Sequence, residues 1–551
     1  MKKFTLAIIK LVLCAIALFL GYWFMLPPIN LRSTEFYSYL IFAIIAVIAI
    51  CTFSDILSVI KSRKSVVVDD DKVFTRLIKK FKALKLPVKV GAVTILAVAL
   101  VFVVGTVIGA QIFNASRYNK LITMTDGDFT SEVSEISREQ IPVVDRDTAS
   151  RLGQRKLGEM SDLVSQFEIE ELYTQINYNG RPVRVTPLRY GDAIKWLNNQ
   201  KNGIPAYIMV DMTTQDTTLV RLNEGIKYSQ SEYFMRNIRR KLRFEYPTKI
   251  FGDISFEIDD DGTPYWVAST IEYKIGLFSG EDIGGAVLFN AQTGESKYYD
   301  VKDVPTWVDQ VYESDMILQQ LIYNGKYRSG WLNSIFGQKG VLQPTDGYNY
   351  LAINDDVWLY TGITSVTSDE SNVGFVLTNL RTKETKYYAV PGAEEYSAMS
   401  SAQGQVQHLG YRATFPLLLN VADRPSYFMA LKDSAGLVKM YAFVDVQQYQ
   451  IVGTGSSVEE SRLDYLAKLK SADVDTADKE QQTISGTVSD IESAVVDGNT
   501  CYYIKLSGVD EIFIVSVNMN DKLPFMDEGS AVEISYSKTG EKITVSKIEV
   551  K

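Results

Sequence analysis

The hydrophobic pattern divides the chain at about residue 113. Long apolar stretches occupy residues 4–26, 37–60 and 90–113, and no comparable stretch follows. About 20 apolar residues in a helix, each rising 1.5 Å, span the roughly 30 Å hydrocarbon core of a bilayer. The sequence therefore predicts a three-span membrane anchor over residues 1–113 and a polar region over 114–551.

The charges between the spans predict the orientation. Residues 61–89 carry ten Lys or Arg and three Asp, whereas residues 27–36 carry one Arg and one Glu. Because basic loops stay in the cytoplasm, we expect the N-terminus inside and residues 114–551 outside. Apolar positions within 61–89 recur every three or four residues, as in an amphipathic helix on anionic lipid. The alternative is a solvated connector that only sets topology. The expected lipid-surface residues are Lys79, Lys80, Lys82 and Lys85.

Alternating short segments and turn residues beyond the anchor predict tandem α+β modules. Residues 285–301 match residues 374–390 at 10 of 17 positions, with an offset of 89. A hairpin with an acidic turn is expected before each copy, and a helix after each, over 308–323 and 393–409. The expected divisions are a first α+β region over 114–245, repeats over 246–325 and 326–410, a weaker repeat over 411–470 and a linker over 471–482.

Local signals place further elements. Asp147 is expected to cap a helix over 148–160, and Ser457 with Glu460 forms a capping box. Asn179-Gly180 predicts a hairpin turn. A degenerate earlier copy of the repeat is expected over 190–222.

The repeated strand pattern V-L-x-N-x-x-T-G-E-x-K-Y-Y-x-V resembles the PepSY-type domains of bacterial exported proteins. The resemblance covers about half of the polar region. PepSY-like domains are thought to bind, or to restrain proteases, outside the cytoplasm. The resemblance therefore implies extracytoplasmic binding modules.

The C-terminal residues 483–551 form an all-β pattern. Five strands are expected, with an irregular stretch at 523–527 between the third and the fourth. This arrangement resembles an OB-fold barrel. The expected strands are 484–496, 500–506, 511–517, 531–536 and 543–550.

Charge and cysteine content narrow the setting. Residues 1–113 hold 14 Lys or Arg and 5 Asp or Glu, a net charge of +9. Because the whole chain has a net charge of −9, residues 114–551 carry a net charge of −18. Such an acidic region argues against nucleic acid as a partner. Cys14 and Cys51 lie in apolar stretches, so Cys501 has no partner for a disulfide within 114–551. A large exported region without disulfides suits the bacterial cytoplasmic membrane better than an animal cell surface.

The sequence offers little enzymatic chemistry. His408 is the only histidine, so a two-His zinc site cannot form in one chain, and we expect no metal and no cofactor. Asp259, Asp260 and Asp261 imitate half of a calcium loop, but Ala268 stands where a bidentate carboxylate is needed. We therefore expect a hairpin turn there and a protein that is not an enzyme.

Two residue groups are candidate binding sites. Arginines on a helix expected over 232–244 form a basic patch for lipid headgroups or an anionic wall polymer, although a solvated helix face explains them as well. Paired tyrosines in the repeats place one aromatic ring on each side of a strand, for binding or for packing. These residues are Arg236, Arg239, Arg240, Arg243, Tyr298, Tyr299, Tyr387 and Tyr388.

Together these features predict a membrane-anchored binding or scaffold protein of the cell envelope. Its expected partners are membrane lipids and another envelope protein or wall polymer. Gly105 and Gly109 have the spacing that lets membrane helices approach closely, so a homo-oligomer is possible. Two alternatives remain: regulation or inhibition of an extracytoplasmic protease, and a carboxylate-dependent cell-wall enzyme.

Overall fold

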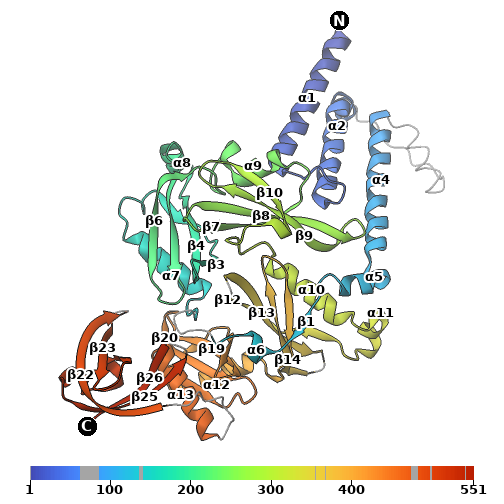
Figure 1. Ribbon diagram of the computed structural model, residues 1–551. Coiled ribbons are helices and arrows are strands. Elements are labelled where there is room, and N and C mark those ends of the chain that lie inside the picture. The colour runs from blue at the N-terminus through green and yellow to red at the C-terminus, as the bar shows by residue number, and fades with distance from the viewer. Residues whose placement is uncertain are drawn as a thin grey trace.

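The N-terminal part of the computed structural model consists of three long apolar helices, and the rest is rich in β-structure (Figure 1). The structure describes residues 2–61, 86–135, 141–353, 355–366, 368–472, 482–496, 499–539 and 542–551. The helices are long and apolar enough to cross a membrane, which fits the predicted anchor. Lys79, Lys80, Lys82 and Lys85 lie outside the described residues. The three helices are α1 (Lys2–Met25), α2 (Thr34–Lys61) and α4 (Leu86–Gly109).

The third membrane helix ends earlier than its apolar stretch. The sequence predicts a span to residue 113, but α4 ends at Gly109, and Ala110 is extended before α5 (Gln111–Asn119). The Asn114 side chain donates to the carbonyls of Ile108 and Ala110 at 2.7 and 3.1 Å. Because the last carbonyls of a helix need such partners, Asn114 stabilises the break.

Four of the five sheets share one plan, a meander of four antiparallel strands preceded by a helix. We call these units modules 1 to 4. Module 1 contains α7 (Arg146–Gly158), β2 (Phe167–Ile169), β3 (Thr174–Tyr178), β4 (Arg181–Tyr190), α8 (Ala193–Asn199), β5 (Ile204–Asp211) and β6 (Thr217–Ile226). Module 2 contains η2 (Phe234–Arg236), α9 (Ile238–Glu245), β7 (Phe251–Ile258), β8 (Pro264–Ile275), β9 (Ser279–Asn290), β10 (Ser296–Asp300) and η3 (Val301–Asp303).

Modules 3 and 4 add short strands to the same meander. In module 3 the segment after α5 also supplies β1, which pairs in parallel with β15. Module 3 contains β1 (Thr125–Gly127), α6 (Phe129–Glu132), α10 (Ser314–Lys326), α11 (Gly330–Leu332), η4 (Asn333–Gly337), β11 (Leu342–Pro344), β12 (Asn349–Ile353), β13 (Asp356–Ser365), β14 (Ser368–Asn379), β15 (Thr385–Tyr388) and β16 (Gly392–Ala393). Module 4 contains α12 (Glu395–Gln405), η5 (Gln407–Leu409), β17 (Arg412–Ala413), β18 (Leu417–Val421), β19 (Arg424–Lys432), β20 (Val438–Asp445), β21 (Val452–Gly455) and α13 (Val458–Ser471).

A shared turn supports the equivalence of the modules. An Asp or Asn ends the third strand of each meander, and its side-chain oxygen accepts hydrogen bonds from the amides two and three residues later, an arrangement that stabilises turns. The residue that follows it accepts a backbone hydrogen bond from a segment preceding a module. The turn residues are Asp211, Asn290, Asn379 and Asp445, and the residues that follow are Met212, Ala291, Leu380 and Val446.

The matched sequence segments occupy equivalent positions in modules 2 and 3. Tyr298 lies opposite Val287, and Tyr387 lies opposite Val376, which keeps the offset of 89 in both strands. The hairpin predicted at Asn179-Gly180 is confirmed as the turn between β3 and β4.

Three predicted helices have different bounds. Asp145, not Asp147, caps α7, and its carboxylate also pairs with Lys432 at 2.6 Å. The helix expected over 232–244 is divided, because Asn237 is extended and caps α9. The helix expected over 308–323 begins at Ser314, because the preceding residues are held by neighbouring modules.

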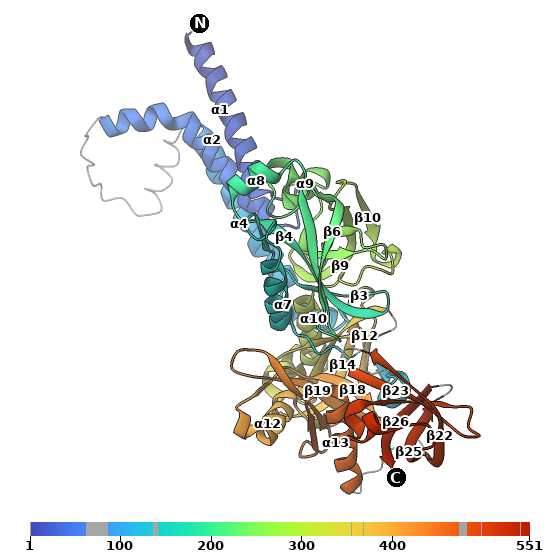
Figure 2. The ribbon, with the colours of Figure 1, turned by 90° about the vertical axis from the view of Figure 1, so that its left-hand side faces the viewer.

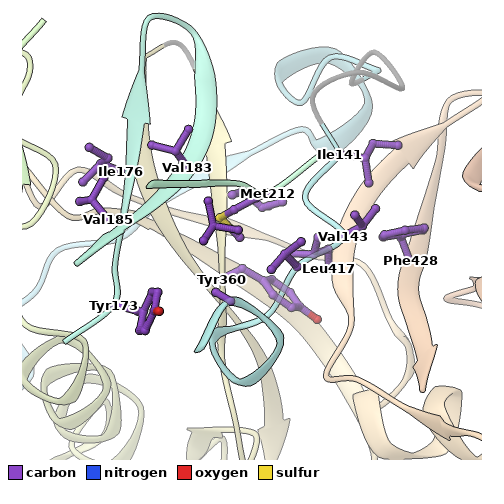
Figure 3. Close-up of a cluster of buried hydrophobic side chains, with 14 of the residues drawn as sticks. Ile141, Val143, Tyr173, Ile176, Val183, Val185, Met212, Tyr360, Leu417 and Phe428 are labelled. Carbon is purple, nitrogen blue, oxygen red and sulfur yellow. The ribbon is translucent and has the colours of Figure 1, made fainter. Parts of the chain in front are cut away.

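Buried hydrophobic side chains from all four modules pack into one cluster, so the modules are not separate folding units in space. Ile176, Val183 and Val185 of module 1 lie near Tyr360 of module 3 and Leu417 of module 4 (Figure 3). The second view shows modules 1 and 2 beside the lower part of the membrane helices and modules 3 and 4 farther below (Figure 2).

The C-terminal strands form an open sheet. Their order is β24-β23-β22-β25-β26, and β24 and β26 lie close together without pairing in the described residues. A closed barrel is therefore not observed among the described residues, and the OB-like assignment stays a prediction, although all five expected strands are present. They are β22 (Gln482–Val496), β23 (Asn499–Leu506), β24 (Ile512–Ser516), β25 (Ala531–Thr539) and β26 (Lys542–Val550), with η6 (Val517–Met519) and η7 (Leu523–Phe525) between β24 and β25.

Candidate functional site

The predicted basic helix docks on the membrane anchor. Ile238 and Leu242 are fully buried, which fixes the inner face of α9. On its other side, the Arg240 guanidinium lies 4.4 Å from the centre of the Trp23 ring of α1, and Arg243 donates to the Leu26 carbonyl at 2.9 Å. Phe244 completes the contact with the aromatic end of α1.

This docking changes the interpretation of the basic patch. Arg240 and Arg243 are engaged with the anchor, and Arg236 donates to the carbonyl of Gln200 at 2.5 Å. Burial lowers the pKa of the Arg243 guanidinium. Of the four predicted arginines, Arg239 is exposed. Most of the patch thus joins parts of the same chain.

The loop between α1 and α2 makes a second contact with module 2. The Ile29 amide donates to Pro247 at 2.6 Å, and the Asn30 side chain donates to the Thr248 carbonyl at 2.9 Å. Arg32 donates to the carbonyl of Tyr273 in β8 at 3.0 Å. Backbone groups of both partners are satisfied across this contact.

The turn between β8 and β9 fits against the membrane helices. The Phe278 ring stacks on Phe102 of α4 at 5.1 Å and meets Tyr37 of α2 edge-on at 5.8 Å. A Cβ atom added at Gly105 would lie 2.7 Å from Phe278, and one at Gly109 would lie 2.5 Å from the Ser279 hydroxyl.

Gly105 and Gly109 therefore form the groove in which this turn lies. Gly276 has φ +63, a backbone conformation suited to glycine, and a Cβ atom added at Gly276 would lie 3.3 Å from the Cα of Gly109. The small-residue spacing allows another element to approach α4 closely, as expected, but that element is a β-turn of the same chain and not a second membrane helix. We call the α9 contact, the loop contact and this groove the anchor joint.

A pocket of about 330 Å³ lies between the end of α5, α10 and the sheet of module 3. Asn119 and Lys120 at the end of α5, Asn324 and Arg328 near the end of α10, and Tyr387 of β15 contribute to its wall. Burial raises the pKa of Tyr387, while Arg328 opposes the shift and Asp126 reinforces it. Cationic and amide groups around an aromatic ring suit a polar, partly anionic group of a partner.

The predicted tyrosines are less accessible than the alternation suggested. We expected one exposed ring in each pair, but Tyr298, Tyr299 and Tyr387 are half-buried and Tyr388 is buried. Tyr298 and Tyr387 donate to carbonyls of the preceding strand at 3.1 and 3.2 Å. Sheet packing accounts for these contacts, and Tyr387 alone of the four lines the pocket.

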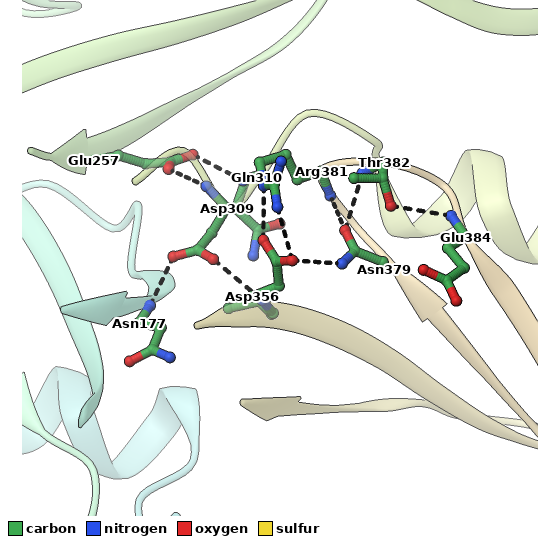
Figure 4. Close-up of polar contacts among 10 residues, drawn as sticks. Asn177, Glu257, Asp309, Gln310, Asp356, Asn379, Arg381, Thr382 and Glu384 are labelled. Atoms are coloured by element: carbon green, nitrogen blue, oxygen red, sulfur yellow. Dashed lines mark hydrogen bonds and ion pairs between the residues drawn. The ribbon is translucent and has the colours of Figure 1, made fainter. Parts of the chain in front are cut away.

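A buried carboxylate pair joins modules 1, 2 and 3 (Figure 4). The Asp309 carboxylate accepts hydrogen bonds from the backbone amides of Asn177 at 2.7 Å and Val357 at 3.1 Å. Glu257 accepts the amides of Asp309 and Gln310 at 2.8 and 3.1 Å. Burial raises the pKa of Glu257 to about 7, and burial together with Glu257 raises that of Asp309.

Sequence reasoning missed this pair. Glu257 occupies the position of an ordinary exposed residue in the alternating strand of Phe256 and Ile258, and no local signal distinguishes it. The Phe278 turn carried a weak signal, since an aromatic ring at a Gly-bounded turn is rarely left to solvent alone.

The remaining candidates occupy ordinary positions. Asp259 accepts the amides of Asp261 and Thr263, which confirms the predicted hairpin turn. His408 lies in the exposed turn after α12, and Cys501 lies in β23. No cluster of three or more potential metal ligands occurs among the described residues.

Comparison with known protein families and curated sequences does not assign this protein to a family. No family model matches the chain, and no curated protein matches its sequence. The class is therefore given by architecture: a membrane-anchored protein with a large β-rich region.

Proposed function

We propose that this protein is a non-enzymatic scaffold of the bacterial cell envelope. It would be anchored in the cytoplasmic membrane and would bind an envelope protein or wall polymer outside the cytoplasm. The anchor joint is the observation that carries the proposal. A tethered enzyme or soluble binding domain needs only a linker, whereas here three contacts fix module 2 against the helices.

A fixed pose suits a protein that positions another component. The shared core transmits that pose from module 2 to the other modules, because packed interiors resist deformation. The pocket near Tyr387 is the proposed contact point for the partner, since it combines Lys120 and Arg328 with an aromatic wall. Its mixed lining supports binding through a few polar groups.

The carboxylates give less support to wall-polymer chemistry. Asp309 accepts backbone amides of modules 1 and 3, and Glu257 of module 2 accepts the amides of Asp309 and Gln310, so their oxygens are committed to the fold. The acidic residues near Asp259 stabilise a hairpin turn. Alanine at Asp259, Asp260 and Asp261 together should therefore leave partner binding intact.

Site-specific photocrosslinking in cells tests the proposal. A photoreactive amino acid at Arg328 or Lys120 should give a discrete cross-linked product, while the same group at exposed Arg412 of β17 should not. Absence of a product at both pocket positions would contradict the binding site. An envelope component other than a protease supports the scaffold, and a protease would instead support restraint, the function that the PepSY resemblance implies.

A further inference from the structure

An exposed apolar patch lies on α8 of module 1 and η2 of module 2. Ile194 is 70% exposed and Phe234 is 65% exposed, which is unusual for such large apolar side chains. The Trp196 ring lies 4.7 Å from Tyr233 and 6.2 Å from Phe234, so the two elements form one surface. We call the surface made by Ile194, Leu197, Tyr233, Phe234 and Met235 the α8–η2 ledge.

One arginine connects the ledge to the membrane anchor. Arg240 donates to the Phe234 carbonyl at 2.8 Å, and the same guanidinium covers the ring of Trp23 at 4.4 Å. Trp23 belongs to the stretch of α1 that can cross a membrane, Ala7–Met25. In Figure 1, α9 lies next to the lower end of α1, and α8 lies farther from the helices at about the same height. The ledge therefore lies at the level of the end of the first span.

The ledge is held outward by its own framework. The buried Glu232 carboxylate accepts hydrogen bonds from the Trp196 indole N–H at 2.7 Å and from the Tyr190 hydroxyl at 2.8 Å. These bonds hold α8 against the segment that precedes Phe234. Phe234 itself has φ +50, a strained conformation for a bulky residue. Such strain persists where the surroundings enforce it, commonly at functional surfaces.

The charges around the ledge fit a lipid surface. Lys201 follows α8 and Arg239 lies on α9, and both are exposed. They stand out because residues 114–551 carry a net charge of −18. Apolar side chains flanked by basic residues are typical of protein surfaces that bind anionic lipid at the membrane interface.

We propose that the α8–η2 ledge is a second membrane contact. It inserts Ile194, Leu197 and Phe234 into the leaflet at which α1 leaves the bilayer, and it places Arg239 and Lys201 at anionic headgroups. Module 1 thereby lies against the membrane beside module 2. This contact is separate from the pocket near Tyr387, so either can fail without the other.

Depth-dependent fluorescence of the full-length protein in nanodiscs tests this proposal. An environment-sensitive dye is attached at Leu197→Cys or Phe234→Cys, in a chain whose Cys14, Cys51 and Cys501 are replaced by Ser. The matched control is Leu437→Cys, an exposed leucine in the turn after β19. The nanodiscs contain phosphatidylcholine, phosphatidylglycerol and a spin-labelled lipid that quenches the dye.

Dye at positions 197 and 234 should emit at shorter wavelength than at 437, and the labelled lipid should quench it at least twofold more strongly. Equal emission and quenching at all three positions would overturn the proposal. A shorter wavelength without quenching would also overturn it, because the ledge would then contact a second copy of the chain. Arg239→Glu should reduce the quenching, and unchanged quenching would exclude a headgroup contact at that residue.

Discussion

At the scale of single residues, the module junction depends on Asp309. Its two carboxylate oxygens accept amides from β3 of module 1 and β13 of module 3, while its own amide donates to Glu257 of β7. Each of these contacts joins segments that are far apart in the sequence. A single side chain thus connects three modules through backbone groups that would otherwise be buried without partners.

Replacing Asp309 by Asn should destabilise this junction. One oxygen becomes an NH₂ group that faces a backbone amide, which leaves a buried donor unsatisfied at a cost of about 1–3 kcal/mol. Thermal unfolding of the purified protein should show a lowered midpoint. Asp303→Asn, an exposed residue in η3, is the matched control. Equal midpoints for the two variants would contradict the assigned role.

Glu257 predicts a pH dependence of stability. Burial raises its pKa from 4.5 to about 7, so the folded protein binds a proton that the unfolded chain releases between these values. Its contribution is therefore most favourable below about pH 4.5 and is lost as the pH rises through 7. The unfolding midpoint of wild type should fall from pH 5 to pH 7.5 more steeply than that of Glu257→Gln. Parallel profiles would show that Glu257 does not titrate in this range.

At the scale of elements, the β8–β9 turn and α4 form a fitted pair. The groove exists because Gly105 and Gly109 lack side chains, and the turn fits because Gly276 adopts positive φ. The predicted seam for a second helix is thus occupied by another element of the chain. This contact could not be predicted from the sequence, because residues 105 and 276 are far apart along the chain.

A larger side chain in this groove should displace the turn. Gly109→Leu places atoms where the Ser279 side chain lies, and overpacking of this kind costs about 1–3 kcal/mol. Because 1.4 kcal/mol is a tenfold change in an equilibrium, limited proteolysis within 274–280 should accelerate about tenfold. Val107→Leu, on the exposed side of α4, should cleave at the wild-type rate. Equal proteolysis rates for Gly109→Leu and Val107→Leu would show that the turn does not depend on the groove formed by the two glycines.

The elements that the sequence predicted well are those decided locally. The Asn179-Gly180 hairpin and the five C-terminal strands follow from turn residues and alternation, and both were found. The C-terminal end of α4 was missed because the apolar pattern does not reveal that the Asn114 side chain donates to the carbonyls of Ile108 and Ala110. The start of α10 was missed because the amides of Val311 and Tyr312 donate to the distant Leu380 carbonyl, a tertiary contact. The basic helix was recognised as a candidate site, but its contact with Trp23 required the fold.

At the scale of the whole molecule, the anchor joint and the shared core form a continuous series of packed contacts. The joint fixes module 2 to the membrane helices, and buried side chains such as Tyr360 and Leu417 continue the packing to modules 3 and 4. A scaffold needs this continuity, because it must hold a partner at a defined place relative to the membrane. We therefore infer that the modules do not move freely on the anchor.

The distance distribution between two spin labels tests that claim most directly. One label is placed at Leu31→Cys in the loop between α1 and α2, and the other at Leu437→Cys in module 4, again without the native cysteines and in nanodiscs. We expect a single narrow distribution that broadens when Phe278→Ala weakens the joint. A broad distribution in the protein with Phe278 intact would contradict it.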